Sequence, residues 1–321
     1  MTLDIRGLTL DYLLPGSPSV RALGGVDLTI ADGEIVGLVG ESGCGKSTLA
    51  YSILRVLPEN AAIRGGSIRF GNRDLLRLTE GRMRNIRWSK IAMVFQSSMN
   101  AFSPVHRIVD QLAAVHMAHV DSDRKTALRV SEKALVQMGI PRSRVRGYPH
   151  EFSGGMRQRA AIALALLLDP EILIADEPTT ALDVVVQDRI LKIIQDWQRD
   201  TGRSVIFVSH DIAVVSEVCD RIAVMYAGLA AEVADKASLL TGPRHPYTQA
   251  LLECVPDVKG REARLLSLPG SPPDLRVRHE GCLFRPRCPK AFADCASVAP
   301  ELYEVSEAHL ARCLLVRPEA S

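Results

Sequence analysis

The spacing of apolar and polar residues predicts strands near the N-terminus. At 26–30, three apolar residues alternate with two polar residues, which is the pattern of a strand with one buried face. Residues 34–39 are almost continuously apolar, which favours a strand buried on both faces. A glycine-rich loop follows, and residues 49–54 are helical in character. This segment therefore predicts the order strand, glycine loop, helix.

Further along the chain, the same patterns predict a mixed α/β domain with a mostly helical insertion. Apolar residues lie on one face of a predicted helix at 123–138, which Gly139 ends. Strands are predicted at 91–95, 171–175 and 205–208, and a helix at 190–197. From about residue 240, proline and glycine punctuate the chain and the periodicity weakens. We therefore expect one domain at 1–240, with a helical subdomain at about 97–165, and a small appendage at 241–321.

The composition narrows the class of protein. The chain has 321 residues, of which 47% are hydrophobic and 24% charged, with a net charge of +2, so it is a globular protein with no general attraction to nucleic acid. The longest apolar runs, at 160–168 and 222–231, are shorter than the ~20 residues of a membrane span. The N-terminus does not resemble a signal peptide. We expect a cytosolic chain whose seven cysteines are not paired in disulfides.

A phosphate-binding loop is the clearest chemical signal. Residues 40–47 fit the pattern G-x-x-x-x-G-K-[ST] between the predicted strand and helix. Glycines let backbone amides point at phosphate oxygens, and the helix N-terminus adds partial positive charge. Lys46 would reach the β- and γ-phosphates, and Ser47 would bind Mg²⁺. The alternative is a chance glycine-rich turn, which the flanking strand and helix disfavour.

An acidic pair follows the predicted strand at 171–175. Asp176 would support Mg²⁺, and Glu177 would polarise the attacking water as general base. An acid after a strand can also simply cap the next helix. The phosphate loop elsewhere in the chain favours the metal-binding interpretation.

Five motifs together resemble an ATP-binding-cassette (ABC) ATPase. They are the loop at 40–48, Gln96 after a strand, the signature-like residues 152–158, Asp176-Glu177, and His210 after the last buried strand. Residues 180–183 resemble the loop that meets a partner ATPase. The resemblance implies an α/β fold of the P-loop NTPase class: a RecA-like core, an antiparallel β-subdomain, a helical signature subdomain and a small Cys-rich C-terminal appendage.

The resemblance also implies roles for individual residues. Gln96, Glu177 and His210 would be catalytic, and Mg²⁺ would be bound through Ser47, Gln96 and Asp176. Ser153 and Gly155 would contact the ATP that is held by the second ATPase of a dimer. The ATP-binding residues would be Tyr12, stacking on adenine, with Gly40, Ser42, Gly43, Gly45, Lys46, Ser47 and Thr48.

A closer resemblance is to the oligopeptide/dipeptide importer ATPases. It rests on residues 148–159, 174–183, 244–248 and 268–273, and Met156 is similar to the D-type subunit. It implies a second, non-identical ATPase, two membrane permeases and an extracytoplasmic solute-binding protein as partners, and a place on the cytoplasmic face of the cell membrane. The solute would be a di- or oligopeptide, with nickel, glutathione, haem precursors or a sugar as alternatives. A soluble ABC ATPase of repair or translation is a further alternative, which the single cassette disfavours.

Four cysteines near the C-terminus leave three interpretations open: reduced thiols, structural zinc, or a [4Fe-4S] cluster bound by Cys282, Cys288, Cys295 and Cys313. Spacings of five and six residues are loose for zinc. Residues 282–288 resemble the Cys-x-Phe-x-x-Arg-Cys tail of the importer ATPases, and this resemblance favours the iron–sulfur cluster. Arg285 and Arg287 would then offset the charge of the cluster, or would be solvated.

Overall fold

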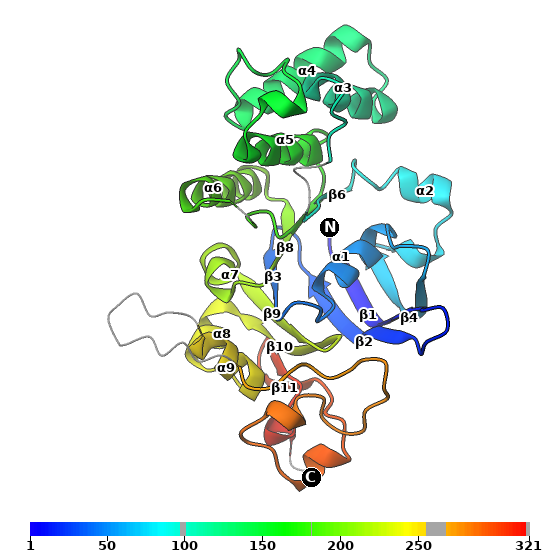
Figure 1. Cartoon of the computed structure of the whole chain (residues 1–321), viewed down its shortest axis with the longest axis vertical. Coiled ribbons are helices and arrows are strands. Elements are labelled where there is room, and N and C mark those ends of the chain that lie inside the picture. The colour runs from blue at the N-terminus through cyan, green and yellow to red at the C-terminus, as the bar shows by residue number, and fades with distance from the viewer. Residues whose placement is uncertain (97–100, 181, 255–267, 319–321) are drawn as a thin grey trace. The chain divides into compact units, whose positions relative to one another are not determined.

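The structure is a computed structural model that describes residues 1–96, 101–180, 182–254 and 268–318 (Figure 1). The chain divides into two compact units. The first unit consists of Arg77–Phe207 together with Met1, and the second of Thr2–Leu76 and Val208–Ser321. Residues 97–100, at the start of the expected helical subdomain, lie outside the described residues, as do 255–267 and 319–321 of the expected appendage and Ala181.

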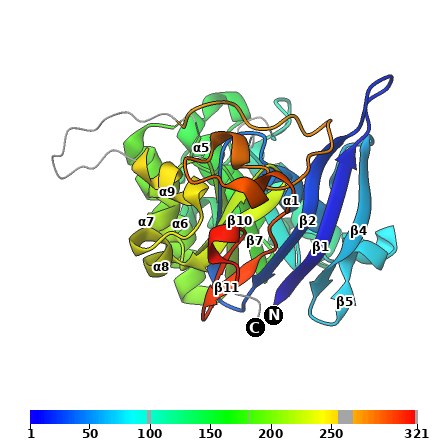
Figure 2. The same ribbon diagram turned by 90° about the horizontal axis from the view of Figure 1, so that it is seen from below.

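The second unit contains two groups of hydrogen-bonded strands. One is antiparallel with the order β2-β1-β4-β5, and Figure 2 shows β1 between β2 and β4. The other has the order β11-β12-β10-β9-β3, in which only β3 and β9 run parallel. The strands are β1 (Leu3–Tyr12), β2 (Val20–Ile30), β3 (Ile35–Val39), β4 (Ala61–Phe70), β5 (Arg73–Asp74), β9 (Arg221–Tyr226), β10 (Leu229–Asp235), β11 (Tyr303–Ser306) and β12 (His309–Ala311).

Short helices cover these strands. The helix α7 packs on β3, and α8 and α9 pack against β10 (Figure 1). Gly37 allows the close approach of α7, because a Cβ atom there would lie 2.2 Å from Val215 Cγ1. The helices of this unit are α1 (Lys46–Leu54), α7 (Ile212–Val218), α8 (Lys236–Thr241) and α9 (Pro246–Glu253), with 3₁₀ turns at Leu75–Arg77, which enters the first unit, Arg285–Arg287, Ala293–Ala296 and Leu314–Val316.

The first unit combines strands with a group of packed helices. The strands β6 and β7 are parallel neighbours, and β8 continues from this unit into the second. The elements are α2 (Glu80–Arg84), β6 (Ile91–Val94), α3 (Ile108–His119), α4 (Arg124–Gln137), a 3₁₀ turn (Pro149–Glu151), α5 (Gly154–Leu166), β7 (Ile172–Asp176), α6 (Val184–Thr201) and β8 (Ser204–Ser209). Among the described residues, no helix combines the length and apolar character needed to cross a membrane.

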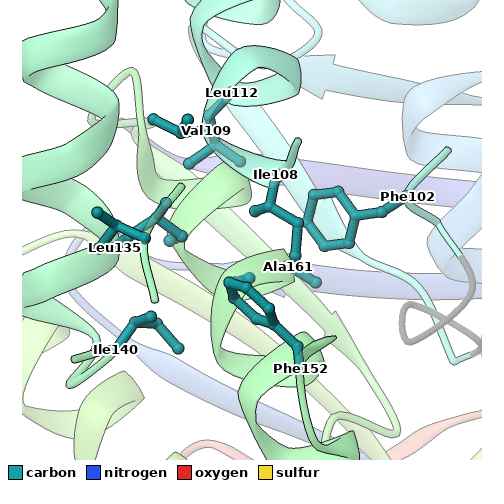
Figure 3. Close-up of a cluster of buried hydrophobic side chains, with 11 residues drawn as sticks. Phe102, Ile108, Val109, Leu112, Leu135, Ile140, Phe152 and Ala161 are labelled. Carbon is teal, nitrogen blue, oxygen red and sulfur yellow. The ribbon is translucent and has the colours of Figure 1, made fainter. Parts of the chain in front are cut away.

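The helices α3, α4 and α5 share a small hydrophobic core (Figure 3). Phe102 and Phe152 lie in it with Ile108, Leu112 and Leu135, and all five are buried. Burying an aliphatic or aromatic side chain contributes roughly 1.5–3 kcal/mol. This cluster therefore holds together the segment that carries the signature-like residues.

The predicted elements are confirmed where the local pattern was strong. The helix expected at 123–138 is α4, and the side chain of Asp123 caps it by accepting a hydrogen bond from Thr126 N (2.6 Å). The strand expected at 26–30 is confirmed, but it is longer because it begins at Val20, and residues before 26 also pair with β1. Residues 35–54 form the predicted order of strand, loop and helix.

A buried carboxylate joins three segments of the second unit. Glu232, on β10, is fully buried and accepts hydrogen bonds from the backbone amides of Arg244 (2.6 Å) and His245 (2.9 Å). His309 Nε2, on β12, lies 2.7 Å from Glu232 Oε1. Satisfying a buried carboxylate in this way avoids a large desolvation penalty. Glu232 thereby holds the entry to α9 and the C-terminal hairpin on the same strand.

Acid should destabilise the second unit through His245. Its Nδ1 caps α9 by accepting a hydrogen bond from Tyr247 N (3.0 Å). Burial lowers the pKa of His245 from 6.5 to about 4; it outweighs a hydrogen bond with the backbone of Arg312, which raises the pKa, and the charge of Arg312 acts in the same direction as burial. The folded state thus keeps the ring neutral while the unfolded state takes up a proton below pH 6.5. The stabilisation is complete above pH 6.5 and is lost as the pH falls towards 4.

His245→Asn should reduce this loss, because asparagine also caps helices but does not titrate. Between pH 7 and pH 5, the free energy of unfolding of the wild type should fall by about 2 kcal/mol more than that of His245→Asn. Denaturant unfolding at both pH values measures the difference. Equal losses in the two proteins would contradict the assignment.

Candidate functional site

The phosphate loop connects the end of β3 to the start of α1 in the second unit. All five residues of β3 are buried, so the strand is a firm base for the loop. Gly40, Gly43 and Gly45 have φ angles of 152°, 78° and 105°, which side-chain-bearing residues rarely adopt. These angles give the loop its sharp curvature ahead of the helix N-terminus, where amide groups and the helix dipole favour an anion.

Glycine is also required by close contacts. A Cβ atom at Gly40 would lie 2.2 Å from Met225 O, and one at Gly45 would lie 2.8 Å from Ala22 O. The loop also bonds to the turn between β9 and β10, where Gly228 N donates to Cys44 O (2.9 Å). The backbone of neighbouring strands therefore fixes the shape of the loop from one side.

Lys46 is folded against the loop. Its Nζ donates to Gly40 O (2.7 Å) and Glu41 O (3.0 Å), and only 5% of the residue is exposed. A buried ammonium group needs such acceptors. Ser42 and Gly43 are exposed at the tip of the loop, and Ser47 and Thr48 are partly exposed in the first turn of α1. This arrangement can hold a chain of phosphates.

Tyr12 ends β1 beside the loop, and its hydroxyl lies 3.1 Å from Thr48 Oγ1. His210 directly follows β8 and is exposed. The next residue, Asp211, caps α7 by accepting a hydrogen bond from Ala213 N (2.8 Å). Tyr12 and His210, which the sequence analysis named for the ATP site, therefore each lie at the end of a strand in the second unit.

The acidic pair lies at the end of β7 in the first unit. Asp176 is fully buried, and Glu177 has a φ of +46°, a left-handed conformation that is strained for glutamate. Gln96 Nε2 donates to Glu177 Oε2 (2.8 Å), and Thr180 Oγ1 donates to the same oxygen (2.9 Å). Two donors therefore orient the carboxylate that the sequence analysis names as general base.

The signature-like residues lie at the start of α5. Ser153 is exposed and caps the helix by accepting a hydrogen bond from Met156 N (3.3 Å). A Cβ atom at Gly155 would lie 2.7 Å from Val186 Cγ1, so glycine lets α5 approach the start of α6. Gln158 Nε2 donates to Pro178 O (2.7 Å). The helix α5 is thereby joined to the turn that carries Glu177.

The prediction of an iron–sulfur cluster is wrong. Within the described residues, which include Cys282, Cys288, Cys295 and Cys313, no group of three or more histidine, cysteine or acidic side chains is arranged to hold a metal ion. This finding also removes the zinc alternative. All four cysteines are free thiols.

The physical reason for this error is that the spacing of cysteines along the chain does not determine how their sulfur atoms are arranged in space. Burial raises the pKa of the thiols of Cys282 and Cys288, and it raises that of Cys313 to about 11. These thiols are therefore protonated at neutral pH in this structure. The expectation for Arg287 as a solvated or cluster-facing residue is wrong as well, because it is 7% exposed and pairs with Glu41.

Comparisons with known proteins agree with the geometry of the loop. A family described as ABC transporter matches residues 23–180, and one described as oligopeptide/dipeptide transporter, C-terminal region, matches residues 231–295. The chain is 48% identical to the probable peptide ABC transporter ATP-binding protein y4tR of Sinorhizobium fredii, over 98% of this chain and 94% of that protein. It is 43% identical to the dipeptide transport ATP-binding protein DppD of Bacillus subtilis, over 98% of this chain and 94% of that protein.

A third relative and a solved structure extend the comparison. The identity to the oligopeptide transport ATP-binding protein OppD of Escherichia coli is 40%, over 97% of this chain and 92% of that protein. The dimeric, post-hydrolysis structure of an ATP-binding cassette bound to ADP and Pi resembles the chain with a TM-score of 0.66 and 27% identity, covering 73% of this chain and 98% of that one. The chain is an ABC ATPase and belongs to the oligopeptide/dipeptide transporter family of ATP-binding subunits.

The expected α/β fold of the P-loop NTPase class and the expected ATPase activity are thus confirmed. ATPase subunits of this family work with membrane permease subunits and a binding protein. The structure adds residues that the sequence analysis did not name for the site, namely Glu41, Tyr247, Arg287, Gln158 and Thr180. All five lie in segments that the sequence analysis singled out, namely 40–48, 152–158, 180–183, 244–248 and 282–288, but the sequence does not reveal the contacts that they make.

Gly45→Ala should weaken ATP binding about tenfold or more, because the added methyl group would collide with a backbone carbonyl at a strained φ. Gly16→Ala is the matched control: Gly16 has a φ of +71° but nothing lies within 4 Å of its Cβ position. The control carries the backbone strain alone and should bind ATP like the wild type. Titration calorimetry compares the three proteins, and equal affinities would refute the steric argument.

Proposed function

We propose that this chain hydrolyses ATP to power the import of di- or oligopeptides through a membrane ABC importer. The observation that carries this proposal is the phosphate loop with Lys46 folded against it, in a chain whose C-terminal region matches the oligopeptide/dipeptide transporter family. The names of the relatives, which refer to peptide, dipeptide and oligopeptide transport, support the solute class. Nickel, glutathione, haem precursors and sugars are the alternative solutes.

ATP would bind with its phosphates on the loop. Lys46 would exchange its bonds to Gly40 O and Glu41 O for the β- and γ-phosphates, and backbone amides of residues 43–48 would donate to phosphate oxygens. The aromatic ring of Tyr12 would stack on adenine, for which its place beside Thr48 is support. Ser42 would contribute from the exposed tip of the loop.

The donors named for Mg²⁺ suit a hard cation. Hydroxyl and carboxylate oxygens and an amide oxygen are its preferred ligands, and Ser47, Asp176 and Gln96 offer these. Asp176 is completely buried, and a buried carboxylate needs a positive charge close by, which supports its role as a Mg²⁺ ligand. When bound, the ion neutralises charge on the β- and γ-phosphates.

Glu177 would act as general base. Its carboxylate would accept a proton from a water molecule as the water oxygen bonds to the γ-phosphorus and the bond to the ADP oxygen breaks. Gln96 and Thr180 would orient the carboxylate through their hydrogen bonds to Oε2. His210 would contact the γ-phosphate, for which its exposure at the end of β8 is support.

A second ATPase would complete each nucleotide site. Ser153 and Gly155 would contact the ATP of the partner, with the N-terminus of α5 directed at its phosphates. Val184 and Val185, which start α6, are 80% and 79% exposed, and an apolar surface of this kind beside the signature-like residues suits a protein interface. We infer a non-identical partner, two permeases and a solute-binding protein, with the ATPases on the cytoplasmic face of the membrane.

Glu177→Gln should retain ATP binding and lower the hydrolysis rate by ~10²–10⁴-fold, the usual contribution of a general base. The same variant should trap a dimer with the partner ATPase, because ATP would remain at the interface. Steady-state phosphate release and equilibrium ATP binding measure the two effects. Glu171→Gln is the control, since Glu171 is bonded to Lys90 at the other end of β7 (2.6 Å) and should leave hydrolysis unchanged. Wild-type turnover in Glu177→Gln would refute its role.

Purification of the chain from membranes of its native host in mild detergent tests the importer itself. We expect two permeases, a second ATPase of different sequence and a solute-binding protein to be recovered and identified by mass spectrometry. The recovered binding protein can then be titrated with peptides, nickel, glutathione and sugars, which decides between the solutes. Recovery of ribosomal or repair proteins alone would contradict import.

A further inference from the structure

The second residue of the phosphate loop is held by the C-terminal region of the chain. Glu41 receives two hydrogen bonds on its carboxylate from Arg287, at 2.6 Å (Nη1 to Oε2) and 2.9 Å (Nη2 to Oε1). Its backbone amide donates to the hydroxyl of Tyr247 (3.0 Å), and its carbonyl accepts from Lys46 Nζ (3.0 Å). All four residues belong to the second unit. The carbonyl of Glu41 also accepts a hydrogen bond from Cys44 N (3.3 Å), so each polar group of Glu41 has a partner, and two of its four partner residues lie beyond residue 240.

Contacts other than the one with Glu41 hold the side chain of Arg287 in place. Its Nε donates to Pro269 O (2.8 Å), its guanidinium lies 5.8 Å from the ring centre of Tyr226, and its side chain is only 2% exposed. The hydrogen bonds to Glu41 raise the pKa of the guanidinium, so it is charged at any physiological pH. An arginine held by several contacts loses little entropy when it binds a carboxylate.

Tyr247 is equally rigid. It is fully buried at the start of α9, and its ring lies 4.7 Å from that of Tyr226 and 5.5 Å from that of Phe284. Phe284 also meets Tyr226, at 5.2 Å, and precedes the 3₁₀ turn that carries Arg287. One aromatic cluster thus supports both of the groups that contact Glu41.

The charges give this contact a function. Glu41 is an acid in a loop that must hold the several negative charges of ATP, and an unpaired carboxylate there would repel them. Arg287 neutralises the carboxylate and keeps it turned towards the C-terminal region. Because Glu41 O also positions Lys46, the contact extends to the lysine that would meet the phosphates.

We propose that Arg287 and Tyr247 are positioning residues of the ATP site, through which the C-terminal region sets the affinity of the phosphate loop for nucleotide. This inference rests on the proposed role of the loop in binding ATP. It assigns to the C-terminal region a task inside its own chain, separate from any contact with the importer.

Arg287→Gln should weaken ATP binding to the full-length chain by about tenfold, because Glu41 loses its counter-charge next to the phosphates. Glu41→Gln in the same chain should restore the affinity to within about threefold of the wild type, since the repulsive charge is then gone. Arg285→Gln is the matched control: the residue lies on the same 3₁₀ turn but is exposed, so ATP affinity should not change. Titration calorimetry with ATP measures all four proteins.

A purely structural role would give a different result. If Arg287 only stabilised the C-terminal region, the double variant would bind ATP as weakly as Arg287→Gln, and the inference would be overturned. Wild-type affinity in Arg287→Gln would overturn it as well. A wild-type chain that fails to bind ATP, or a Lys46→Ala variant that binds it normally, would instead count against the proposed function.

Tyr247→Phe provides a second test that does not depend on the folding of Arg287→Gln. The substitution removes only the hydroxyl that accepts a hydrogen bond from the amide of Glu41. It keeps the aromatic packing, so the fold should remain. ATP binding should fall by about fivefold, because the partly buried amide of Glu41 loses its acceptor and the loop shifts. Unchanged affinity in a folded Tyr247→Phe protein would contradict the role of Tyr247.

Discussion

The phosphate loop depends on groups outside itself, and this constraint organises the second unit. Within the loop Cys44 N donates to Glu41 O (3.3 Å), but amides that must remain available for phosphate cannot be used in this way, and the glycines supply no packing. The shape is therefore set by backbone from β9 and β2, by Lys46 across the loop, and by Glu41, whose amide and carboxylate are held from far along the chain. A backbone held in this way can keep its shape when an anion binds, while Lys46 exchanges its acceptors for phosphate oxygens.

In the first unit, the residue that follows β7 also depends on groups around it for its conformation. Glu177 has a left-handed backbone that glutamate does not favour, and the cost has to be offset by its surroundings. Gln96 and Thr180 hold the carboxylate, while Gln158 holds the carbonyl of Pro178. Because Gln158 lies on the helix that starts with the signature-like residues, its hydrogen bond connects the strained turn to the surface proposed for the partner ATPase. A displacement of the turn that carries Glu177 should therefore shift α5, and a displacement of α5 should shift the turn.

Local signals in the sequence were reliable because they describe local physics. The alternation of apolar residues, the cap Asp123 and the glycines of the loop each determine the conformation of a few neighbouring residues, and the structure confirms the strands and helices they predicted. The cysteine spacing failed because metal binding depends on how the side chains are arranged in space. The pairing of Arg287 with Glu41 joins residues 246 positions apart, so no pattern in one sequence could reveal it.

The link between the C-terminal region and the loop must act in both directions. If Arg287 and Tyr247 increase the affinity of the loop for ATP, linkage requires that bound ATP strengthens their hold on Glu41 by the same factor. The aromatic cluster around Tyr226 would then be more stable in the nucleotide-bound chain than in the empty one. An appended region that is stabilised by the nucleotide can report the state of the ATP site to whatever it contacts. The same ion pair therefore provides a physical route from ATP occupancy to the surface of the C-terminal region.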